Sequence, residues 1–124
     1  MSLKVGEIIT FERTFTVEDV ELFTKVSGDE GIHHLTTDEQ GRLVVQGLLT
    51  ATLPTKVGGD NNVLARTMNF EFFRPVFTGD TIICEVIIDQ FEKQDNRTGI
   101  AASFLCKNQN EKEVLRGNFA GVIL

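Results

Sequence analysis

The most informative stretch of this chain is residues 27–34, which read Ser-Gly-Asp-Glu-Gly-Ile-His-His. Asp29 precedes His34 by five positions, and Gly28 beside the acid allows the backbone to turn. The only two histidines of the sequence, His33 and His34, both lie in this stretch. A carboxylate and an imidazole can each hold or move a proton, so this short polar segment predicts a site that handles water.

Two later segments accompany this stretch in the same order along the chain. Residues 44–49 read Val-Val-Gln-Gly-Leu-Leu, and residues 72–80 read Phe-Phe-Arg-Pro-Val-Phe-Thr-Gly-Asp. Together the three segments resemble the MaoC-like branch of the hot-dog fold, the (R)-specific enoyl-CoA hydratases and dehydratases. That family carries Ser-Gly-Asp-x-Asn-Pro-x-His, then His-Gly-Met/Leu at the start of a long helix, then an Arg-x-Pro-Val-like turn ending in Gly-Asp. The resemblance spans most of the 124 residues.

The resemblance implies a fold for the chain. It predicts an α+β class, with residues 1–124 forming a single hot-dog domain in which a curved antiparallel sheet wraps around a central helix. An order of strand, helix, loop, central helix and four strands fits this architecture. Hot-dog proteins commonly dimerise by joining two sheets edge to edge, so the resemblance also implies a homodimer or higher oligomer whose active site draws on both subunits.

The resemblance further implies a reaction, in which water is added to a trans-2-enoyl thioester to give an (R)-3-hydroxyacyl thioester, or removed from it. Coenzyme A or acyl carrier protein would carry the acyl group. Asp29 and His34 would transfer the protons, and the backbone N–H of Gly47 would contact the thioester oxygen, with Gln46 and Leu48 binding substrate beside it. This chemistry needs no metal or redox cofactor, and the sequence offers no ligand cluster for one.

Three departures from the family pattern leave other functions open. Gly31-Ile32 replaces the family's Asn-Pro, Gln46 replaces the histidine of His-Gly, and the connection between His34 and Gln46 is shorter. A glutamine can donate a hydrogen bond but cannot ionise. These departures are compatible with a hydratase that has a changed substrate. A thioesterase, in which water attacks the carbonyl, is a second alternative, because thioester hydrolysis is the other common activity of the fold that the resemblance implies. The departures are also compatible with a non-catalytic module that binds acyl-CoA.

The remaining polar residues near these segments have structural interpretations. We expect His33 to point away from the site, because adjacent side chains diverge, and Glu30 to be a solvated loop acid. We expect Arg74 to pair with a carboxylate such as Asp80, and Ser27 to close the turn.

Composition excludes several classes of function. A chain of 124 residues with 41% hydrophobic and 24% charged residues is long enough for one globular core without disulfides. Its net charge of −6 argues against nucleic-acid binding. No apolar run reaches the length of a membrane span, and the N-terminus lacks the apolar stretch of a signal peptide, so we expect a cytoplasmic protein. Cys84 and Cys106 lie in apolar, strand-like runs and are expected to be buried thiols.

Hydrophobic periodicity predicts the elements. A helix is expected from an N-cap at Thr16 to about Ser27, with Gly28 as its stop and an apolar stripe that includes Val17, Val20 and Val26. A second helix is expected to begin at Gln46 and to kink or end near Pro54, with a breaker at residues 58–62. The strands are expected at 8–15, around 67–72, and at 81–91, 100–107 and 114–123, with a polar turn at 93–99.

Overall fold

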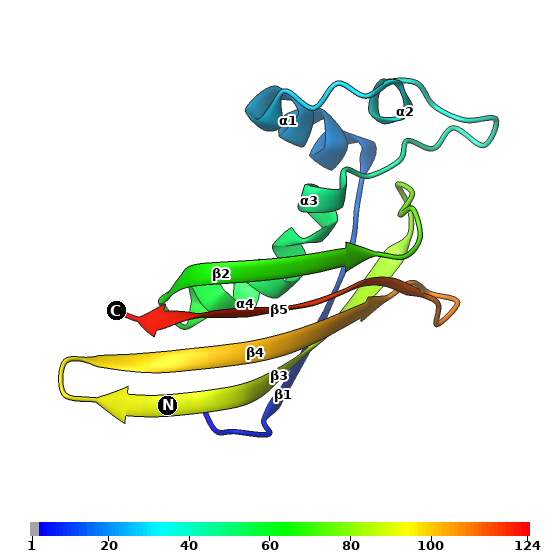
Figure 1. Ribbon diagram of the computed structural model, residues 1–124. Helices are drawn as coiled ribbons and strands as arrows, with labels where there is room; N and C mark the ends of the chain where they lie inside the picture. The colour runs from blue at the N-terminus through cyan, green and yellow to red at the C-terminus, as the bar shows by residue number, and fades with distance from the viewer. Residues whose placement is uncertain (1–2) are drawn as a thin grey trace.

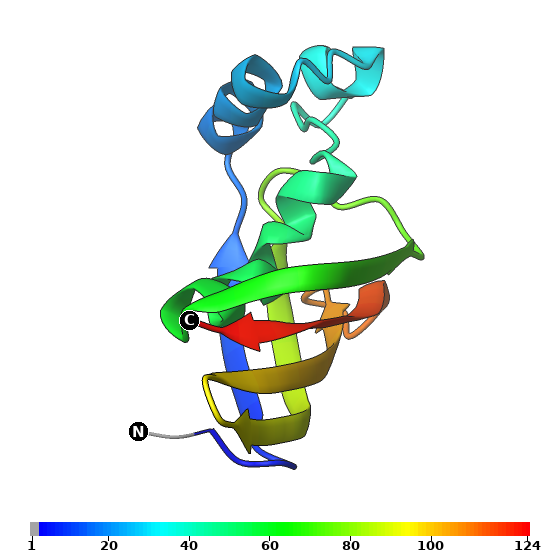
Figure 2. The same ribbon diagram turned by 60° about the vertical axis from the view of Figure 1, so that its left-hand side comes forward.

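The computed structural model describes residues 3–124 and shows a curved antiparallel sheet with helices on one side (Figures 1 and 2). The five strands have the spatial order β1-β3-β4-β5-β2. Their bounds are β1 Ile8–Thr14, β2 Val63–Phe72, β3 Thr81–Gln94, β4 Arg97–Lys107 and β5 Glu113–Ile123. The four helices are α1 Val17–Ser27, α2 Ile32–Leu35, α3 Gly47–Thr50 and α4 Thr52–Asp60. The predicted α+β class is confirmed.

Helix α1 begins and ends where the sequence predicts. A capping box closes its N-terminus, because the Asp19 N–H donates to Thr16 Oγ1 (3.1 Å) and the Thr16 N–H donates to Asp19 Oδ2 (2.9 Å). Gly28 ends the helix in the left-handed region with φ 72°. The predicted apolar stripe is only partly buried, since Val20 is fully covered whereas Val26 is 86% exposed.

The second predicted helix forms as two pieces, α3 and α4, with a break at Ala51. Pro54 is the physical reason, because it has no N–H to offer the carbonyl of Thr50 and its ring crowds that carbonyl. Pro54 itself is tolerated in the first turn of α4. The expected breaker at residues 58–62 was placed too early. Helix α4 continues through both glycines to Asp60, and the Asn61 side chain donates to Val57 O (2.8 Å) to close its end.

The core lies between the concave face of the sheet and helix α4, around which the sheet curves (Figure 2). Alternate residues of β3, from Ile82 to Ile88, are fully buried while those between them are exposed, as expected for a strand with one solvated face. Leu53 and Val57 of α4 cover this face. The predicted turn at 93–99 is wrong, since β3 and β4 continue to a two-residue turn with Gln94 paired to Arg97.

Two core thiols face each other across β3 and β4. Cys84 and Cys106 are directly opposite in the register, are fully buried, and are free. Their expected role as buried apolar side chains is confirmed. Among the described residues 3–124, none of the helices has the length and apolar character needed to cross a membrane.

Candidate active site

The loop after α1 places Asp29 and His34 beside each other. The Ser27 hydroxyl donates to Phe23 O (2.7 Å) and accepts from the Asp29 N–H (3.0 Å), which closes the turn as predicted. Three residues after Asp29, the short helix α2 begins and turns His34 inward. Asp29 Oδ2 then lies 3.6 Å from His34 Nε2. The imidazole is buried, with 6% of the side chain exposed, whereas the carboxylate is 48% exposed.

The contacts of the His34 ring define its tautomer. Nδ1 lies 2.6 Å from the carbonyl oxygen of Val44. A carbonyl oxygen only accepts hydrogen bonds, so Nδ1 carries a proton and Nε2 is the nitrogen that can accept one from its surroundings. The distance of 3.6 Å from Nε2 to Asp29 Oδ2 exceeds a direct hydrogen bond. It leaves both atoms within reach of one shared water, because a water beside the pair can lie about 2.8 Å from each.

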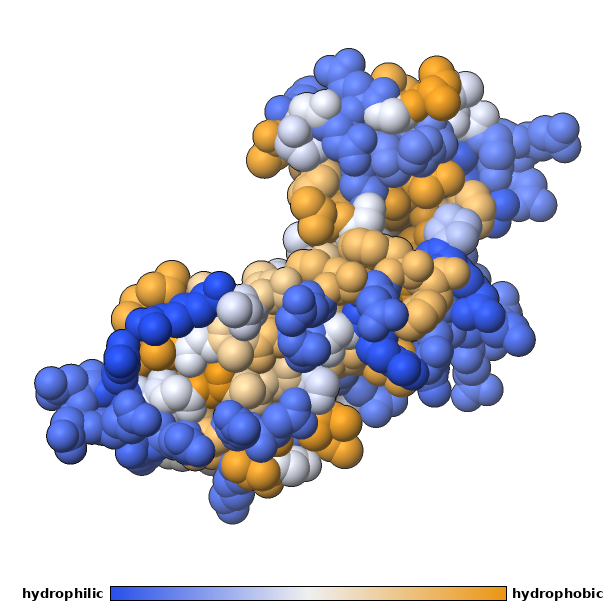
Figure 3. Space-filling model, viewed as in Figure 1, coloured by the Kyte–Doolittle hydropathy of each residue, from blue (hydrophilic) through white to orange (hydrophobic). Residues whose placement is uncertain are grey.

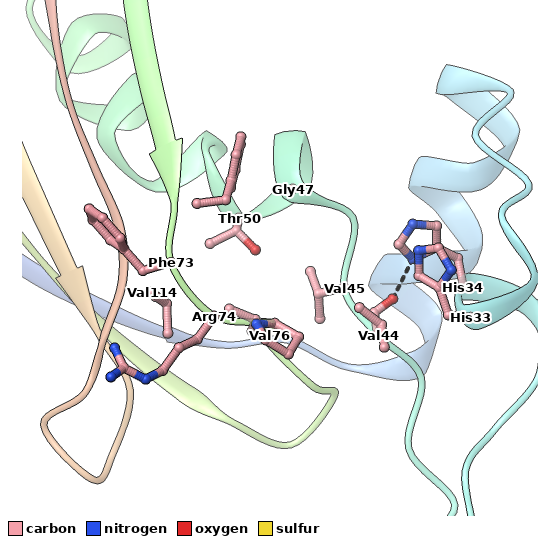
Figure 4. A pocket seen from close by; sticks show the side chains of 12 residues that line it. His33, His34, Val44, Val45, Gly47, Thr50, Phe73, Arg74, Val76 and Val114 are labelled. Atoms are coloured by element: carbon pink, nitrogen blue, oxygen red, sulfur yellow. Dashed lines mark hydrogen bonds between the residues drawn. The ribbon is translucent and has the colours of Figure 1, made fainter.

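A cavity of about 310 Å³ opens beside His34 (Figure 4). Its lining is mostly apolar, with two imidazoles, one hydroxyl and one guanidinium residue, and it is formed by His33, His34, Val44, Val45, Gly47, Thr50, Phe72, Phe73, Arg74, Pro75, Val76 and Val114. Asp29 contacts the site through His34 and is not part of this lining. Figure 3 shows hydrophobic residues gathered where the surface is hollowed between the part that holds α1 and α2 and the sheet.

Gly47 lies at the N-terminus of α3 and lines the cavity. The first N–H to close a helical bond belongs to Thr50, which donates to Gln46 O (3.0 Å). The N–H groups of Gly47 and the next two residues therefore have no partner inside the helix. A Cβ on Gly47 would lie 2.9 Å from the ring of Phe72, so the missing side chain is what lets this ring and the helix N-terminus approach.

The structure places Gln46 and Leu48 differently from Gly47. The Gln46 side chain is fully buried and turns to α1, where Nε2 donates to Thr24 Oγ1 (2.9 Å). Neither Gln46 nor Leu48 lines the cavity, and Leu48 is 60% exposed. Their roles in substrate binding stay predictions. Within residues 3–124 the Gln46 Oε1 atom is buried without a hydrogen-bond partner.

Two expectations for neighbouring residues are wrong. His33 does not point away from the site, since its ring lies against that of His34 with centroids 3.9 Å apart and it lines the cavity. Arg74 does not pair with Asp80. Its Nη1 donates to the carbonyl oxygen of Glu113 (2.7 Å), while Asp80 accepts from the Phe77 N–H (2.9 Å).

Sequence reasoning missed two groups at the site. The carbonyl of Val44 orients His34, but a backbone acceptor leaves no signal in the sequence. Thr50 brings a hydroxyl to the cavity, and its position one turn after Gly47 on the same helix was the available signal.

Comparisons with known proteins concern the chain as a whole. No family model matches the chain. The mitochondrial 3-hydroxyacyl-[acyl-carrier-protein] dehydratase of Arabidopsis thaliana is 26% identical over 129 residues, covering 98% of this chain and 78% of that protein.

Solved structures of similar fold superpose on nearly the whole chain. The unliganded R-hydratase PhaJ1 from Pseudomonas aeruginosa superposes with a TM-score of 0.81 at 22% identity, covering 98% of this chain and 81% of that one. The (R)-hydratase from A. caviae involved in PHA biosynthesis superposes with a TM-score of 0.82 at 23% identity, covering 99% of this chain and 98% of that one. The MaoC-like dehydratase from Rhodospirillum rubrum superposes with a TM-score of 0.76 at 16% identity, covering 98% of this chain and 93% of that one. The hot-dog fold of this chain and its resemblance to the MaoC-like hydratases and dehydratases are therefore confirmed.

Proposed function

We propose that this protein is a lyase that interconverts a trans-2-enoyl thioester and an (R)-3-hydroxyacyl thioester by adding or removing water. The observation that carries the proposal is the pair formed by His34 Nε2 and Asp29 Oδ2, 3.6 Å apart, beside an apolar cavity. The similarity to an acyl-carrier-protein dehydratase and to two (R)-hydratases supports the same chemistry.

The pair can manage both protons of the reaction. In hydration, a water held between Asp29 and His34 loses one proton to one member of the pair, and its oxygen bonds to the β-carbon of the enoyl group. The π electrons of the double bond take up a proton at the α-carbon from the pair, and the proton gained from water restores the pair to its starting protonation state. The two groups act as a coupled pair, and their roles are reversed in the dehydrating direction. Atoms balance with water as the only co-reactant, so the reaction requires no further cofactor.

Negative charge grows on the thioester oxygen when the β-carbon is attacked. The N–H of Gly47, which has no partner inside α3, is the group that we propose to stabilise it, because a backbone donor aimed at a developing oxyanion lowers the energy of that charge. Coenzyme A and acyl carrier protein are both carriers that would present such a thioester. The acyl chain would occupy the apolar part of the cavity, which Val45, Phe72 and Val76 help to line.

We also propose a homodimer that joins the β2 edges of two copies. β2 is an edge strand, and the Phe73 N–H donates inward to Val114 O (3.0 Å). Because backbone bonds alternate in direction along a strand, the N–H groups of Met68, Phe70 and Phe72 point to the open edge. Open edges with apolar residues are templates for pairing, and Phe72 is 51% exposed. The cavity lies at the end of β2, so a partner would complete its wall.

The oligomeric state tests this interface. Met68→Lys on β2 is expected to give a monomer in sedimentation velocity, because a charge on each edge repels its copy. Ile87→Lys on the interior strand β3, at a residue of similar exposure, is the matched control and is expected to sediment as wild type.

A cytoplasmic location stays a prediction, compatible with the two free thiols.

The function is tested with crotonyl-CoA and longer enoyl-CoAs, with absorbance of the enoyl thioester and release of free thiol followed in parallel. Loss of absorbance without thiol supports hydration. Thiol release shows a thioesterase instead. Saturable binding by calorimetry without either signal shows a binding module. The calorimetric test for a binding module is needed because Gln46 replaces the family's histidine and its side chain is bonded to α1.

A further inference from the structure

We infer that His33 is a positioning residue for His34, and that residue 31 is glycine because the ring of His33 occupies the space where a side chain would be. The inference rests on the proposed function, since it concerns how the imidazole of that site is held. It assigns a role to two residues, Gly31 and His33, that the expected catalytic pair does not include.

The first observation concerns three of the groups that lie around the His34 ring. Val44 O accepts from Nδ1 at 2.6 Å, and Asp29 Oδ2 lies 3.6 Å from Nε2. The His33 ring lies against the ring itself, with centroids 3.9 Å apart and planes inclined by 56°. Hydrogen bonding in the ring plane leaves an imidazole able to tilt about that bond, and an aromatic neighbour against the ring opposes the tilt.

The second observation concerns Gly31. Its backbone has φ −52° and ψ 138°, a conformation open to any residue, so no positive φ requires a glycine here. The constraint is space. A Cβ at this position would lie 2.9 Å from His33 Cε1 and 3.3 Å from His34 Cδ2.

The third observation is that the backbone fixes His33 independently of its ring. The Val44 N–H donates to His33 O (3.0 Å), while the Val44 carbonyl accepts from His34 Nδ1. Both histidines are thus tied to one residue of the strand-like segment that borders the cavity. With its backbone held in this way, His33 places its ring against that of His34 and also lines the cavity.

Two variants remove the contact by different routes. His33→Ala deletes the ring, and Gly31→Ala displaces it. Each is expected to lower kcat about tenfold with KM changed less than about twofold, because a catalytic group held less firmly spends less time in the productive geometry. His33→Phe keeps an aromatic ring but has no nitrogen that can bind or release a proton, and it is expected to retain turnover within about twofold. The double variant Gly31→Ala/His33→Ala is expected to be no slower than His33→Ala, since both changes act through one contact.

A readout without substrate separates this inference from the proposed function. The chain has only two histidines, so the imidazole ring signals in proton–carbon NMR spectra are assigned by a single His33 variant. The His34 signals are expected to move in His33→Ala and in Gly31→Ala through loss of the ring current of His33. Ile32→Ala, at a 72% exposed residue of the same helix, is the control and is expected to leave them in place.

Unchanged His34 signals in both variants would overturn the inference, as would a loss of turnover in His33→Phe equal to that in His33→Ala, which would show a proton-carrying role. A wild-type protein that turns over no enoyl thioester, with His34 signals that move as expected, would sink the proposed function and leave the contact established.

Discussion

The Nδ1 atom of His34 lies 2.6 Å from the carbonyl oxygen of Val44, and this bond decides which nitrogen faces Asp29. Because the carbonyl can only accept, the neutral ring carries its proton on Nδ1 and presents the lone pair of Nε2 to the carboxylate side of the site. Nitrogen-15 NMR spectra are expected to show this tautomer. A neutral ring protonated on Nε2 would contradict the proposed geometry.

The two nitrogens of His34 can be tested separately by substitution. His34→Asn places an amide N–H where Nδ1 lies and is expected to keep the bond to Val44 O, so the melting temperature should stay close to that of wild type. It removes Nε2, and turnover is expected to fall about 10²–10⁴-fold, the range for loss of a general acid or base. Retention of turnover in His34→Asn would show that Nε2 carries no proton in the reaction.

Gly47→Ala is expected to lower kcat/KM about tenfold. The added Cβ would lie 2.9 Å from the Phe72 ring, so this half-exposed ring has to move. Because the ring lines the cavity, its movement changes the shape of the site and the position of a bound substrate. Stability is expected to change by less than about 1 kcal/mol, because the displaced group is a flexible side chain. Gly59→Ala is the control. It has open space around it in α4, so it is expected to gain about 0.5–1 kcal/mol of stability without a change in turnover.

Gly117→Ala is expected to destabilise the fold by about 3 kcal/mol or more, which lowers the melting temperature by roughly 10 °C. A Cβ there would overlap the backbone oxygen of Asn69 on β2 and lie 2.8 Å from the Phe104 ring, and neither a paired strand nor a core ring can withdraw. Gly99→Ala on β4 meets only Glu92 O at 4.0 Å and is expected to melt at or slightly above the wild-type temperature. Equal melting temperatures for the two variants would show that β2 and β5 do not approach as described.

The two thiols are expected to be inert in the folded protein. The hydrogen bond with Cys106, together with burial, raises the pKa of the Cys84 thiol well above its ordinary range, so thiolate is scarce at neutral pH. A disulfide-exchange reagent at pH 8 is expected to label the native chain only at the rate of unfolding. The same reagent in denaturant should label both cysteines at once. Rapid labelling of the native chain would contradict the burial of this pair.

Local signals in the sequence predict the parts of the fold that local chemistry determines. The capping box of Thr16 and Asp19 and the left-handed Gly28 act within a few residues, and they place α1 correctly. Pro54 correctly predicts a disturbed helix. It does not predict that the break falls at Ala51, because the disturbed carbonyl belongs to the residue four positions earlier.

At the site, the sequence predicts the acid and the imidazole because they share one short loop. The partners that orient them come from elsewhere in the chain. Gln46 bonds to α1 because packing brings Thr24 to it, and no sequence spacing encodes that contact. His33 turns toward the cavity because Gly31 leaves room for its ring, a steric effect that becomes visible only when the backbone is known.

The central claim is that Asp29 and His34 together move the protons of enoyl-thioester hydration. The most direct test is crotonyl-CoA hydration by wild type, Asp29→Asn, His34→Ala and the double variant, with circular dichroism to show that all four are folded. Turnover is expected in wild type and to fall about 10²–10⁴-fold in each single variant, with the double variant no slower than the worse single one. A folded single variant that hydrates crotonyl-CoA at the wild-type rate would contradict the claim.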